Sequence, residues 1–535
     1  NQSGGTKSFT GAITDLGDGD GNGISLTNNT GATTSFTGQL TLATGANPAL
    51  TATGGGTVSA TNAGSTLATT TATALNVANT TIGDSDLTFR SIASNGASTG
   101  IVLNNTGNAN GRLAVGGNGG TCTSAGSCTG GAIQESTGQG VVLNSVPGGV
   151  SLTRMFIGRV AAGGDDGING TTVNGFSMDH SVVQNNGNAA AERGLEFSNL
   201  TGTVAMDTDT VSGNAEDGLQ IVNDTGTMNA SVTNGSYSNQ STTGTGNDGI
   251  LMVGTNTANE TLNIQGSAFA TNRGDHVQVS NGGGSPTQDV TVNGTTMTSP
   301  ASGILGGGIT ISPSGGAHVT SRVTNNSITN SKSSSVNHNF VSGSGTMDVR
   351  VTGNTLTAPG ADEVQLYNTG TQTVKALVDS NTMSGHNFAG IDILSGDGDG
   401  SMNVTATHTT ISGGGTNAFA GIFADMGTTD PNAAGHPDQG TSCLDIGSTT
   451  AGLKNSILNS KGPSGTSDIR IKNRFAVTVR LPGYTGAATG ANILTSYLQN
   501  RNNGNGTPSE SDSASSTSGW ANTSPAGSAC PQPAP

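Results

Sequence analysis

Residues 349–357 read VRVTGNTLT, residues 376–384 read ALVDSNTMS, and residues 404–412 read VTATHTTIS. In each stretch apolar residues alternate with polar ones, a short polar turn follows, and a single apolar residue then stands between Thr or Ser residues. Alternation with a period of two is typical of a β-strand that has one buried face. Because similar stretches return at a nearly constant interval, the sequence predicts a repeated β-structure and not a disordered chain.

The apolar residue near the end of each stretch gives the period of the repeat. Ten such residues are 26 to 32 positions apart, about 28 on average: Ile157, Val183, Val211, Tyr237, Phe269, Met297, Ile328, Leu356, Met383 and Ile411. Another apolar residue or Ala stands five positions before each of them, and a third apolar patch follows most of them, as in DGLQI at residues 217–221. Each repeat is therefore expected to form three short strands with Gly, Asn and Asp turns between them.

The composition excludes several other fold classes. The 535 residues include 87 Gly and 15 Pro, with 3% aromatic and 10% charged residues. Gly and Thr are poor helix formers, and Gly is too rare and too irregular for a collagen repeat. Only 31% of the residues are hydrophobic, so a single deep core is not expected. A repeat that cannot bury its own apolar face is stabilised by stacking on its neighbours, and we therefore predict a parallel β-solenoid.

These repeats resemble those of the right-handed parallel β-helix proteins, the pectin-lyase-like superfamily, of the type found in the passenger regions of bacterial exoproteins and adhesins. The resemblance covers about residues 7–450 and implies right-handed coils of three strands with aliphatic ladders inside. The predicted fold class is an all-β, single-stranded right-handed parallel β-helix of about 28 residues per coil. We divide the chain into weakly registered coils at 1–120, a regular β-helix at 121–450, a capping region at 451–502 and a Ser/Gly/Pro-rich tail at 503–535.

The capping region differs in character from the repeats. Residues 473–484, NRFAVTVRLPGY, alternate apolar and polar residues and predict a strand. Residues 491–503, ANILTSYLQNRNN, place Ile493, Leu494, Tyr497 and Leu498 on one face of a short helix. We predict that this region closes the solenoid. A basic binding patch is the alternative, because four basic residues gather there: Arg470, Lys472, Arg474 and Arg480.

The charge balance and the cysteine count predict the compartment and the partners. The chain has 18 Lys and Arg against 34 Asp and Glu, so nucleic acids and anionic lipids are not expected partners. No apolar run is long enough to insert into a membrane. Four cysteines in a chain rich in Gly, Ser, Thr and Asn predict an extracellular protein, secreted or on the cell surface. No signal peptide opens the sequence, so we expect a mature product or a fragment.

Two disulfides are expected. Cys122 and Cys128, in TCTSAGSCTG, are six positions apart in a Gly-rich loop. Zinc would need a second pair of ligands at a matching spacing, so a local disulfide is predicted, with free thiols as the alternative. Cys530 is expected to pair with Cys443 if the tail packs against the solenoid. No cofactor is predicted, with Ca²⁺ as the one candidate.

Aspartate recurs two positions before the third strand of several repeats, at Asp166, Asp217, Asp248, Asp275 and Asp362. The three middle ones fall on consecutive repeats, where stacked carboxylates would repel unless a cation such as Ca²⁺ lay between them. The alternative is turn chemistry, because Asp before Gly is common in turns.

A second candidate for Ca²⁺ is the loop DLGDGDGNG, with Asp15, Asp18 and Asp20, which lacks the final Glu of a full EF-hand loop. It also lies where a turn is due, so the turn interpretation applies there too.

Asp179 and Asp207 share one position on adjacent repeats, and their spacing suits the paired carboxylates of a retaining glycosidase. They are weak candidates for catalysis, because a sugar-processing site also needs a groove, aromatic residues and a raised pKa.

His180 and His408 share a position eight repeats apart, too far for a common ligand. The β-helix polysaccharide lyases place a basic residue beside their acids. We find no Arg or Lys at a matching position next to a column of acids here, so that activity is not carried over.

We predict an extracellular structural or adhesive β-solenoid, such as a surface stalk, an adhesin or a fibre subunit, without enzymatic activity. Its expected partner is a surface glycan or protein. Two alternatives stay open: a self-assembling filament subunit that binds its own copies end to end or through the tail, and a glycan-binding or glycan-cleaving β-helix. The second alternative predicts aromatic and carboxylate residues along the corner before the third strand, where the repeats vary in length.

Overall fold

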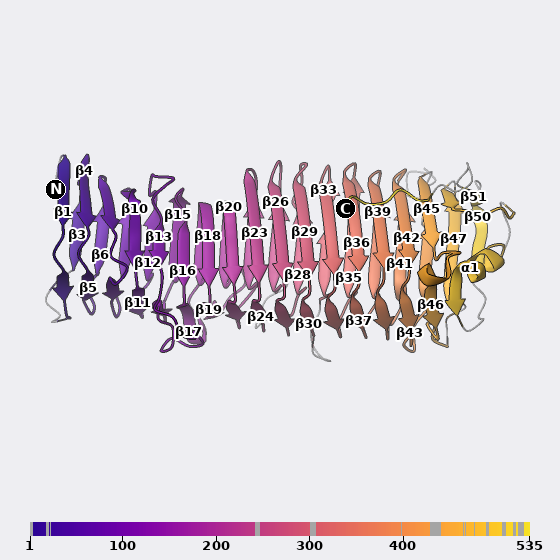
Figure 1. Ribbon diagram of the computed structural model, residues 1–535, viewed down its shortest axis with the longest axis horizontal. Coiled ribbons are helices and arrows are strands. Elements are labelled where there is room, and N and C mark those ends of the chain that lie inside the picture. The colour runs from indigo at the N-terminus through magenta and orange to yellow at the C-terminus, as the bar shows by residue number, and fades with distance from the viewer. Residues whose placement is uncertain are drawn as a thin grey trace. The chain divides into compact units, whose positions relative to one another are not determined.

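A computed structural model describes residues 4–17, 21, 23–240, 247–299, 306–396, 398–427, 440–463, 465, 467–475, 477–487, 492–504, 510–516, 520–522 and 529–535. The chain forms two compact units. The first unit consists of Asn1–Met252 and Asn272–Gly274, and the second of Val253–Thr271 and Asp275–Pro535. Within each unit the strands are stacked in parallel ladders (Figure 1).

The first unit is a parallel β-solenoid with three ladders. One contains β3 (Ile24–Thr27), β6 (Leu50–Thr53), β9 (Leu75–Ala78), β12 (Ile101–Asn104), β15 (Val141–Val146), β18 (Ile168–Asp179), β20 (Leu195–Asp207) and β22 (Leu219–Asn223). The next contains β1 (Gly5–Phe9), β4 (Ala32–Phe36), β7 (Thr57–Ala60), β10 (Thr81–Phe89), β13 (Leu113–Val115), β16 (Val150–Thr153), the ends of β18 and β20, and β23 (Thr227–Thr233). The third contains β2 (Ile13–Asp15), β5 (Leu40–Ala43), β8 (Thr66–Ala68), β11 (Ser91–Asn95), β14 (Gly131–Gln134), β17 (Met155–Gly163), β19 (Val182–Asn186), β21 (Thr210–Ser212) and β24 (Ser236–Ser238).

The second unit also contains three parallel ladders. One contains β28 (Val277–Asn281), β31 (Ile309–Ser312), β35 (Val336–Gly343), β38 (Val364–Thr369), β41 (Ala389–Gly396), β44 (Ala420–Met426), β47 (Ile469–Phe475) and β50 (Glu510–Ser516). The next contains β26 (Asn259–Gln265), β29 (Thr287–Asn293), β33 (His318–Thr324), β36 (Thr346–Thr352), β39 (Thr373–Asp379), β42 (Ser401–Thr407), β45 (Thr441–Ile446), β48 (Thr478–Leu481) and β51 (Trp520–Asn522). The third contains β27 (Ala268–Ala270), β30 (Thr296–Thr298), β34 (Ser327–Thr329), β37 (Thr355–Thr357), β40 (Thr382–Ser384), β43 (Thr410–Ser412), β46 (Asn455–Leu458) and β49 (Asn502–Gly504).

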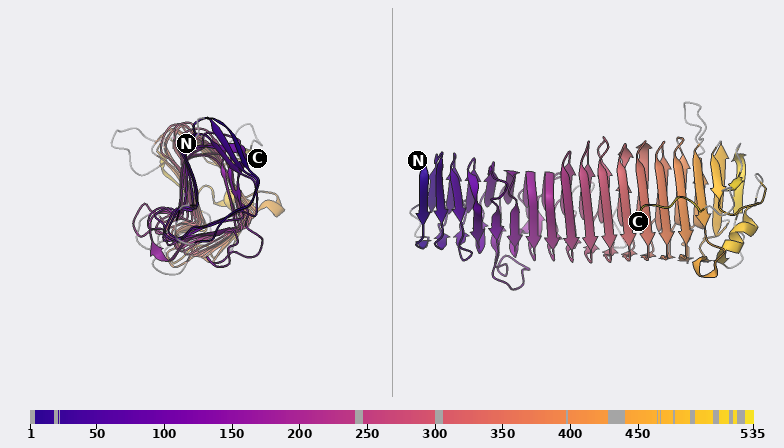
Figure 2. Two further views of the ribbon diagram at one scale, coloured as in Figure 1. Left: turned by 90° about the vertical axis from the view of Figure 1, so that its left-hand side faces the viewer. Right: turned by 45° about the horizontal axis from the view of Figure 1, so that its top comes forward.

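The core of each unit is built from side chains that repeat once per turn. In the second unit Ile328, Leu356 and Met383 are register partners on successive turns, and each is 0% exposed. Figure 2 shows how strands of successive turns lie side by side within this unit. The predicted parallel β-solenoid and its period of about 28 residues are therefore confirmed.

Buried amide side chains form a second kind of ladder in the second unit. Asn326, Asn354 and Asn381 stand two positions before the core residue of their turn. Oδ1 of Asn354 accepts the backbone N–H of Asn326 at 2.9 Å and its side-chain amide at 3.0 Å. Nδ2 of Asn354 donates to the carbonyl oxygen of Val323 at 2.9 Å. Since buried polar groups are costly when unpaired, this ladder fixes the register of the turns.

The first unit has an amide ladder at a different corner. Asn186, Asn214 and Gln240 are buried three positions after the core residue of their turn. Oδ1 of Asn214 accepts the backbone N–H of Asn186 at 3.1 Å, and Nδ2 of Asn214 donates to Oε1 of Gln240 at 3.1 Å. Both corners therefore satisfy buried backbone groups with a side chain from the next turn.

The C-terminal part of the second unit contains the expected strand and helix. In β48 and just before it, Val477, Val479 and Leu481 are buried, and the helix α1 spans Thr495–Arg501. Leu494 and Leu498 are both 0% exposed. Whether this region closes the solenoid stays a prediction. Of the helices in the described residues, none has the length and apolar character that a membrane crossing requires.

Candidate functional site

One candidate site lies at a corner of the first unit, where β16, β18 and β20 end. The next residue has a left-handed backbone at each of these ends, with φ of 54° at Arg154, 49° at His180 and 57° at Thr208. The N–H of Arg154 donates to the carbonyl oxygen of Asp179 at 2.8 Å, and the N–H of His180 donates to that of Asp207 at 2.9 Å. This repeated turn stacks polar side chains from successive turns on one outer edge.

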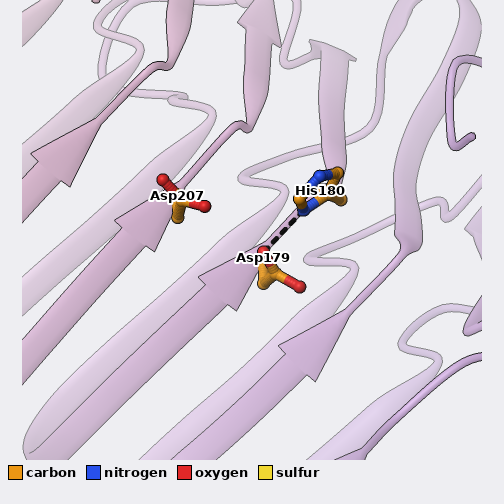
Figure 3. A group of neighbouring side chains, drawn as sticks. All are labelled: Asp179, His180 and Asp207. Atoms are coloured by element: carbon orange, nitrogen blue, oxygen red, sulfur yellow. Dashed lines mark hydrogen bonds and ion pairs between the residues drawn. The ribbon is translucent and has the colours of Figure 1, made fainter. Parts of the chain in front are cut away.

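Asp179, His180 and Asp207 form the centre of this site (Figure 3). Nδ1 of His180 is 2.6 Å from Oδ1 of Asp179, and one ligand atom from each of the three residues lies within 4.8 Å of the other two. Nη1 of Arg154 is 3.8 Å from Oδ2 of Asp179. The side chains of Asp179 and His180 are 39% and 41% exposed, so the group is open to solvent. Two carboxylates and an imidazole are a donor set suited to a divalent cation.

The environment of Asp207 favours its ionised form. The Thr233 hydroxyl donates to Oδ1 of Asp207, and the Thr208 hydroxyl donates to Oδ2 at 3.2 Å. These hydrogen bonds, that from Thr233 first, hold the pKa of Asp207 below its usual range. An ionised Asp207 is suited to bind a cation or to act as a nucleophile, but it is not suited to act as a general acid.

Only part of this site could be predicted from the sequence. Asp179 and Asp207 are register partners on adjacent turns, as their shared position suggested. The expectation that no basic residue stands beside an acid column is wrong, because Arg154 occupies the position of His180 on the neighbouring turn. The contact of His180 with Asp179 was also not predicted. The place of His180 directly after Asp179, at a corner where the backbone turns, is the signal that could have found it.

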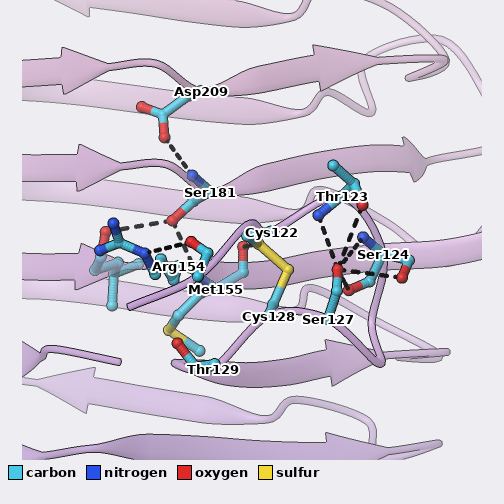
Figure 4. Close-up of a disulfide and its surroundings, with 12 residues drawn as sticks. Cys122, Thr123, Ser124, Ser127, Cys128, Thr129, Arg154, Met155, Ser181 and Asp209 are labelled. Atoms are coloured by element: carbon cyan, nitrogen blue, oxygen red, sulfur yellow. Dashed lines mark hydrogen bonds between the residues drawn. A yellow bond between two sulfur atoms is a disulfide. The ribbon is translucent and has the colours of Figure 1, made fainter. Parts of the chain in front are cut away.

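The disulfide Cys122–Cys128 lies next to this corner (Figure 4). Its Cα atoms are 4.3 Å apart, and Nε of Arg154 donates to the carbonyl oxygen of Gly120 in the same loop at 2.9 Å. The loop therefore holds the guanidinium that faces Asp179. The second disulfide joins Cys443 to Cys530 in the second unit, with the Cα atoms 5.5 Å apart.

The aspartates before the third strand have a structural role at their corners. Asp217 and Asp248 are buried in the first unit, and Oδ1 of Asp217 accepts the backbone N–H of Asp248 at 2.7 Å. Burial raises the pKa of Asp217 to about 7. In the second unit Asp275 accepts the N–H of Gly307, and burial raises its pKa. These contacts support the turn interpretation, and Ca²⁺ binding there stays a prediction.

The proposed Ca²⁺ loop is described only in part. Asp15 ends β2, and its Oδ1 accepts the N–H of Gly17 at 3.3 Å, as in a turn. Asp18 and Asp20 lie outside the described residues. A Ca²⁺ site there stays a prediction.

A second candidate site lies in the second unit, and of its residues only Arg470 and Lys472 were candidates from the sequence. Asp392 of β41, Phe423 of β44 and Arg470 of β47 are register partners on successive turns. Two residues further along the same strands, Asp425 of β44 and Lys472 of β47 are also register partners. Aspartate, aromatic and basic residues thus gather on the ladder that follows the variable corner. We call these five residues the carboxylate–aromatic cluster.

Burial changes the acid–base properties of this cluster. Asp392 is 2% exposed, and burial raises its pKa to about 7. The Tyr367 hydroxyl donates to Oδ2 of Asp392 at 2.5 Å. Asp362, also buried, has a pKa raised to about 8, by burial first and then by the charge of Asp392. Carboxyls that exchange protons near neutral pH are suited to general acid–base chemistry.

Two further phenylalanines, Phe388 and Phe419, pack against Phe423 of the cluster. The rings of Phe388 and Phe419 are stacked with centroids 5.7 Å apart, and Phe423 meets Phe419 edge to face at 4.9 Å. The Arg470 guanidinium lies 5.3 Å from the ring of Phe419, and Nζ of Lys472 lies 5.6 Å from that of Phe423. Such cation–π contacts hold the two cations against the aromatic rings.

Comparisons of the chain with protein-family models, with curated proteins and with solved structures gave no match.

Proposed function

We propose that this chain is an extracellular structural and adhesive β-solenoid, without catalytic activity, that binds a surface glycan or protein. The observation that carries the proposal is a row of exposed hydroxyl side chains on successive turns of the second unit. We call it the hydroxyl row: Thr296, Ser327, Thr355, Thr382 and Thr410.

The hydroxyl row combines regular spacing with a rigid support. Parallel strands lie about 4.8 Å apart, so the row offers one hydroxyl at each such step. The residue after each hydroxyl, such as Leu356 or Met383, is buried in the core and holds the strand in place. Each hydroxyl can both donate and accept a hydrogen bond. Many weak contacts at a fixed spacing support adhesion to a repeating polymer such as a glycan.

The disulfides support an extracellular location. The pairs Cys122–Cys128 and Cys443–Cys530 account for all four cysteines of the chain. Structural disulfides persist in oxidising compartments and are rare in the cytosol. An excess of acidic over basic residues agrees with a partner other than a nucleic acid.

The adhesion proposal is tested by binding of the purified chain to a glycan array and to immobilised cell-surface proteins. The double variant T355V/T382V removes two adjacent hydroxyls but keeps the β-branched shape, and we expect it to weaken binding by at least about tenfold. T287V/T346V is the matched control, because Thr287 and Thr346 are also exposed strand residues outside the row. Equal binding by both double variants and the unaltered chain would contradict the role of the row.

The carboxylate–aromatic cluster favours a second candidate function, binding or cleavage of a glycan. It combines three features that such a site uses: aromatic rings, basic residues and a carboxyl with a raised pKa. Aromatic faces stack on sugar rings, and a carboxyl that is protonated near neutral pH can serve as an acid.

This second candidate is tested by incubating the chain with neutral and acidic polysaccharides. New reducing ends would report hydrolysis, and unsaturated products would report elimination. We expect Asp392→Asn and Asp425→Asn to abolish such an activity and Asp289→Asn, at a partly exposed strand position outside the cluster, to keep it. If no polysaccharide is cleaved but binding is lost in Asp392→Asn alone, the cluster is a binding site.

A further inference from the structure

The last residues of the chain, 529–535 with the sequence ACPQPAP, lie on the outer face of the second unit. Cys530 is joined to Cys443 of β45, and Nε2 of Gln532 donates to the Thr405 hydroxyl of β42 at 2.7 Å. From there the segment continues across the strands towards β36 (Figure 1). We call residues 530–535 the tail segment.

Two arginines and an aspartate hold the end of the tail segment. Nε of Arg350 donates to the carbonyl oxygen of Ala534 at 2.8 Å, and its Nη2 donates to that of Pro533 at 2.9 Å. Oδ2 of Asp348 accepts the N–H of Ala534 at 3.2 Å. Nη2 of Arg322 donates to the oxygen of Pro535 at 2.7 Å. Arg322 and Arg350 are register partners on adjacent turns, so the arginines form a short column.

Neighbouring charges hold these side chains in place. Nη1 of Arg322 is 2.5 Å from Oδ1 of Asp289, and Nζ of Lys375 is 3.6 Å from Oδ1 of Asp348. The groups that contact the tail are therefore fixed on strands of the solenoid. A site built on strands is more precisely arranged than one built on loops.

The contacts fit an extended, proline-containing peptide. Extended chain advances about 3.1 to 3.4 Å per residue and strands are about 4.8 Å apart, so the peptide meets a new turn about every one and a half residues. Proline has no N–H to donate, and the two arginines accordingly donate to oxygens: Arg350 to the carbonyl oxygens of Pro533 and Ala534, and Arg322 to an oxygen of Pro535. Asp348 accepts the N–H of Ala534, between two prolines. Pro533 is buried, whereas Gln532 and Ala534 on either side are exposed.

We propose that this face, formed by Asp348, Arg350, Arg322 and Thr405, is a docking site for the tail segment of a second copy of the chain. Its hydrogen bonds go to the peptide backbone and to Gln532, so the tail of another copy offers the same groups. Every copy carries both the site and the ligand, which is the condition for exchange of a segment between copies. In the exchanged form Cys443 of one copy pairs with Cys530 of another, and the disulfide links the two chains. The inference goes beyond adhesion and does not depend on it.

The test mixes two single variants of the full chain under mildly oxidising conditions. Cys443→Ser leaves Cys530 free on its tail, and Cys530→Ser leaves Cys443 free beside the docking site. A Cys443–Cys530 bond between them can form only if the tail of one copy reaches the site of another. We expect this mixed dimer, identified by mass spectrometry of the linked peptides, and a yield that rises with concentration.

The arginines provide the decisive control. With Arg322→Ala and Arg350→Ala introduced into the Cys530→Ser partner, we expect the mixed dimer to form at least about tenfold more slowly, because hydrogen bonds to charged groups are lost. Arg112→Ala is the matched control, since Arg112 is an exposed arginine of the first unit paired with Asp86. Thermal unfolding shows whether each variant keeps its fold. A folded pair that gives no mixed dimer, or a rate that the docking-site arginines do not change, overturns the proposal.

Discussion

In the first unit the amide ladder follows the core residues of the third ladder, which contains β21, whereas in the second unit it precedes those of the third ladder, which contains β37. Asn214 stands three positions after Val211, and Asn354 stands two positions before Leu356. In both places one side-chain oxygen accepts a backbone N–H of the previous turn. The comparison teaches that a buried amide can link successive turns at either corner beside the third ladder.

Asp209 of the first unit occupies the corner that the amides use in the second. Its Oδ1 accepts the N–H of Ser181 at 2.8 Å, but Oδ2 has no hydrogen-bond partner among the described residues. The next turn has Gly235 at this position, which brings no side chain. Burial raises the pKa of Asp209 to about 8, and the charges of Asp179 and Asp207 add to the shift. A carboxyl is thus a poorer ladder residue than an amide.

Breaking the ladder of the second unit should have the largest effect. Asn354→Leu keeps the size of the side chain but leaves the N–H of Asn326 and the carbonyl of Val323 unpaired in the core. We expect the free energy of unfolding to fall by about 3 to 5 kcal/mol. Urea unfolding followed by circular dichroism measures the loss, and hydrogen exchange of β37 locates it. Thr355→Val, at the exposed neighbouring position, should change stability by less than about 0.5 kcal/mol.

Replacing Asp209 with asparagine, the residue that the second unit has at this corner, should stabilise the protein at high pH. The pKa of Asp209 is raised in the folded state above the unfolded value near 4. The contribution of Asp209 to the stability of the fold is therefore complete below pH 4 and is lost as the pH rises to about 8. Asp209→Asn removes this loss. The Nδ2 of the new asparagine can donate to the carbonyl oxygen of Met178, just as Nδ2 of Asn354 donates to that of Val323. We expect a gain of about 2 to 3 kcal/mol at pH 8 and little change at pH 4. A gain that is the same at both pH values would argue against the buried charge.

The reverse change in the first unit should imitate Asp209. In Asn214→Asp the new carboxylate faces Oε1 of Gln240 and repels it when ionised, whereas the protonated acid can donate as the amide does. We expect a loss of about 1 to 2 kcal/mol at pH 8 and a smaller loss at pH 4. The measurement is urea unfolding at the two pH values. Equal losses would show that geometry and not charge is responsible.

Completing the ladder of the second unit should give the smallest effect. Thr409 stands between Asn381 and Asn455, and its hydroxyl accepts the N–H of Asn381 at a long 3.4 Å. Thr409→Asn offers an amide there, and we expect a gain of about 0.5 to 1 kcal/mol. Thermal unfolding is sensitive enough to detect it. A loss instead of a gain would mean that the corner has no room for an amide.

The fold could be predicted from the sequence because its core residues repeat. Ile328, Leu356 and Met383 are apolar at a constant spacing, and a solenoid turns that spacing directly into contact. The amide ladders could not be predicted, because Asn354 is equally typical of a turn. The contact of Arg350 with Ala534 joins positions 184 residues apart, which no local pattern reveals. The carboxylate–aromatic cluster was not predicted because its acidic, aromatic and basic residues are distributed over three turns, and only the stacking of those turns brings them together.

The claim on which all of this depends is that equivalent residues of successive turns lie side by side in register. The double variant Thr355→Cys with Thr382→Cys tests it most directly, because these two positions are register partners. Strands about 4.8 Å apart bring the two Cα atoms within the range of a disulfide. We predict that a disulfide forms rapidly between the two introduced thiols. Little or no disulfide should form in the variant that combines Thr355→Cys with Ser384→Cys, which is out of register. Equal formation in both variants, or formation only in the second, would contradict the account.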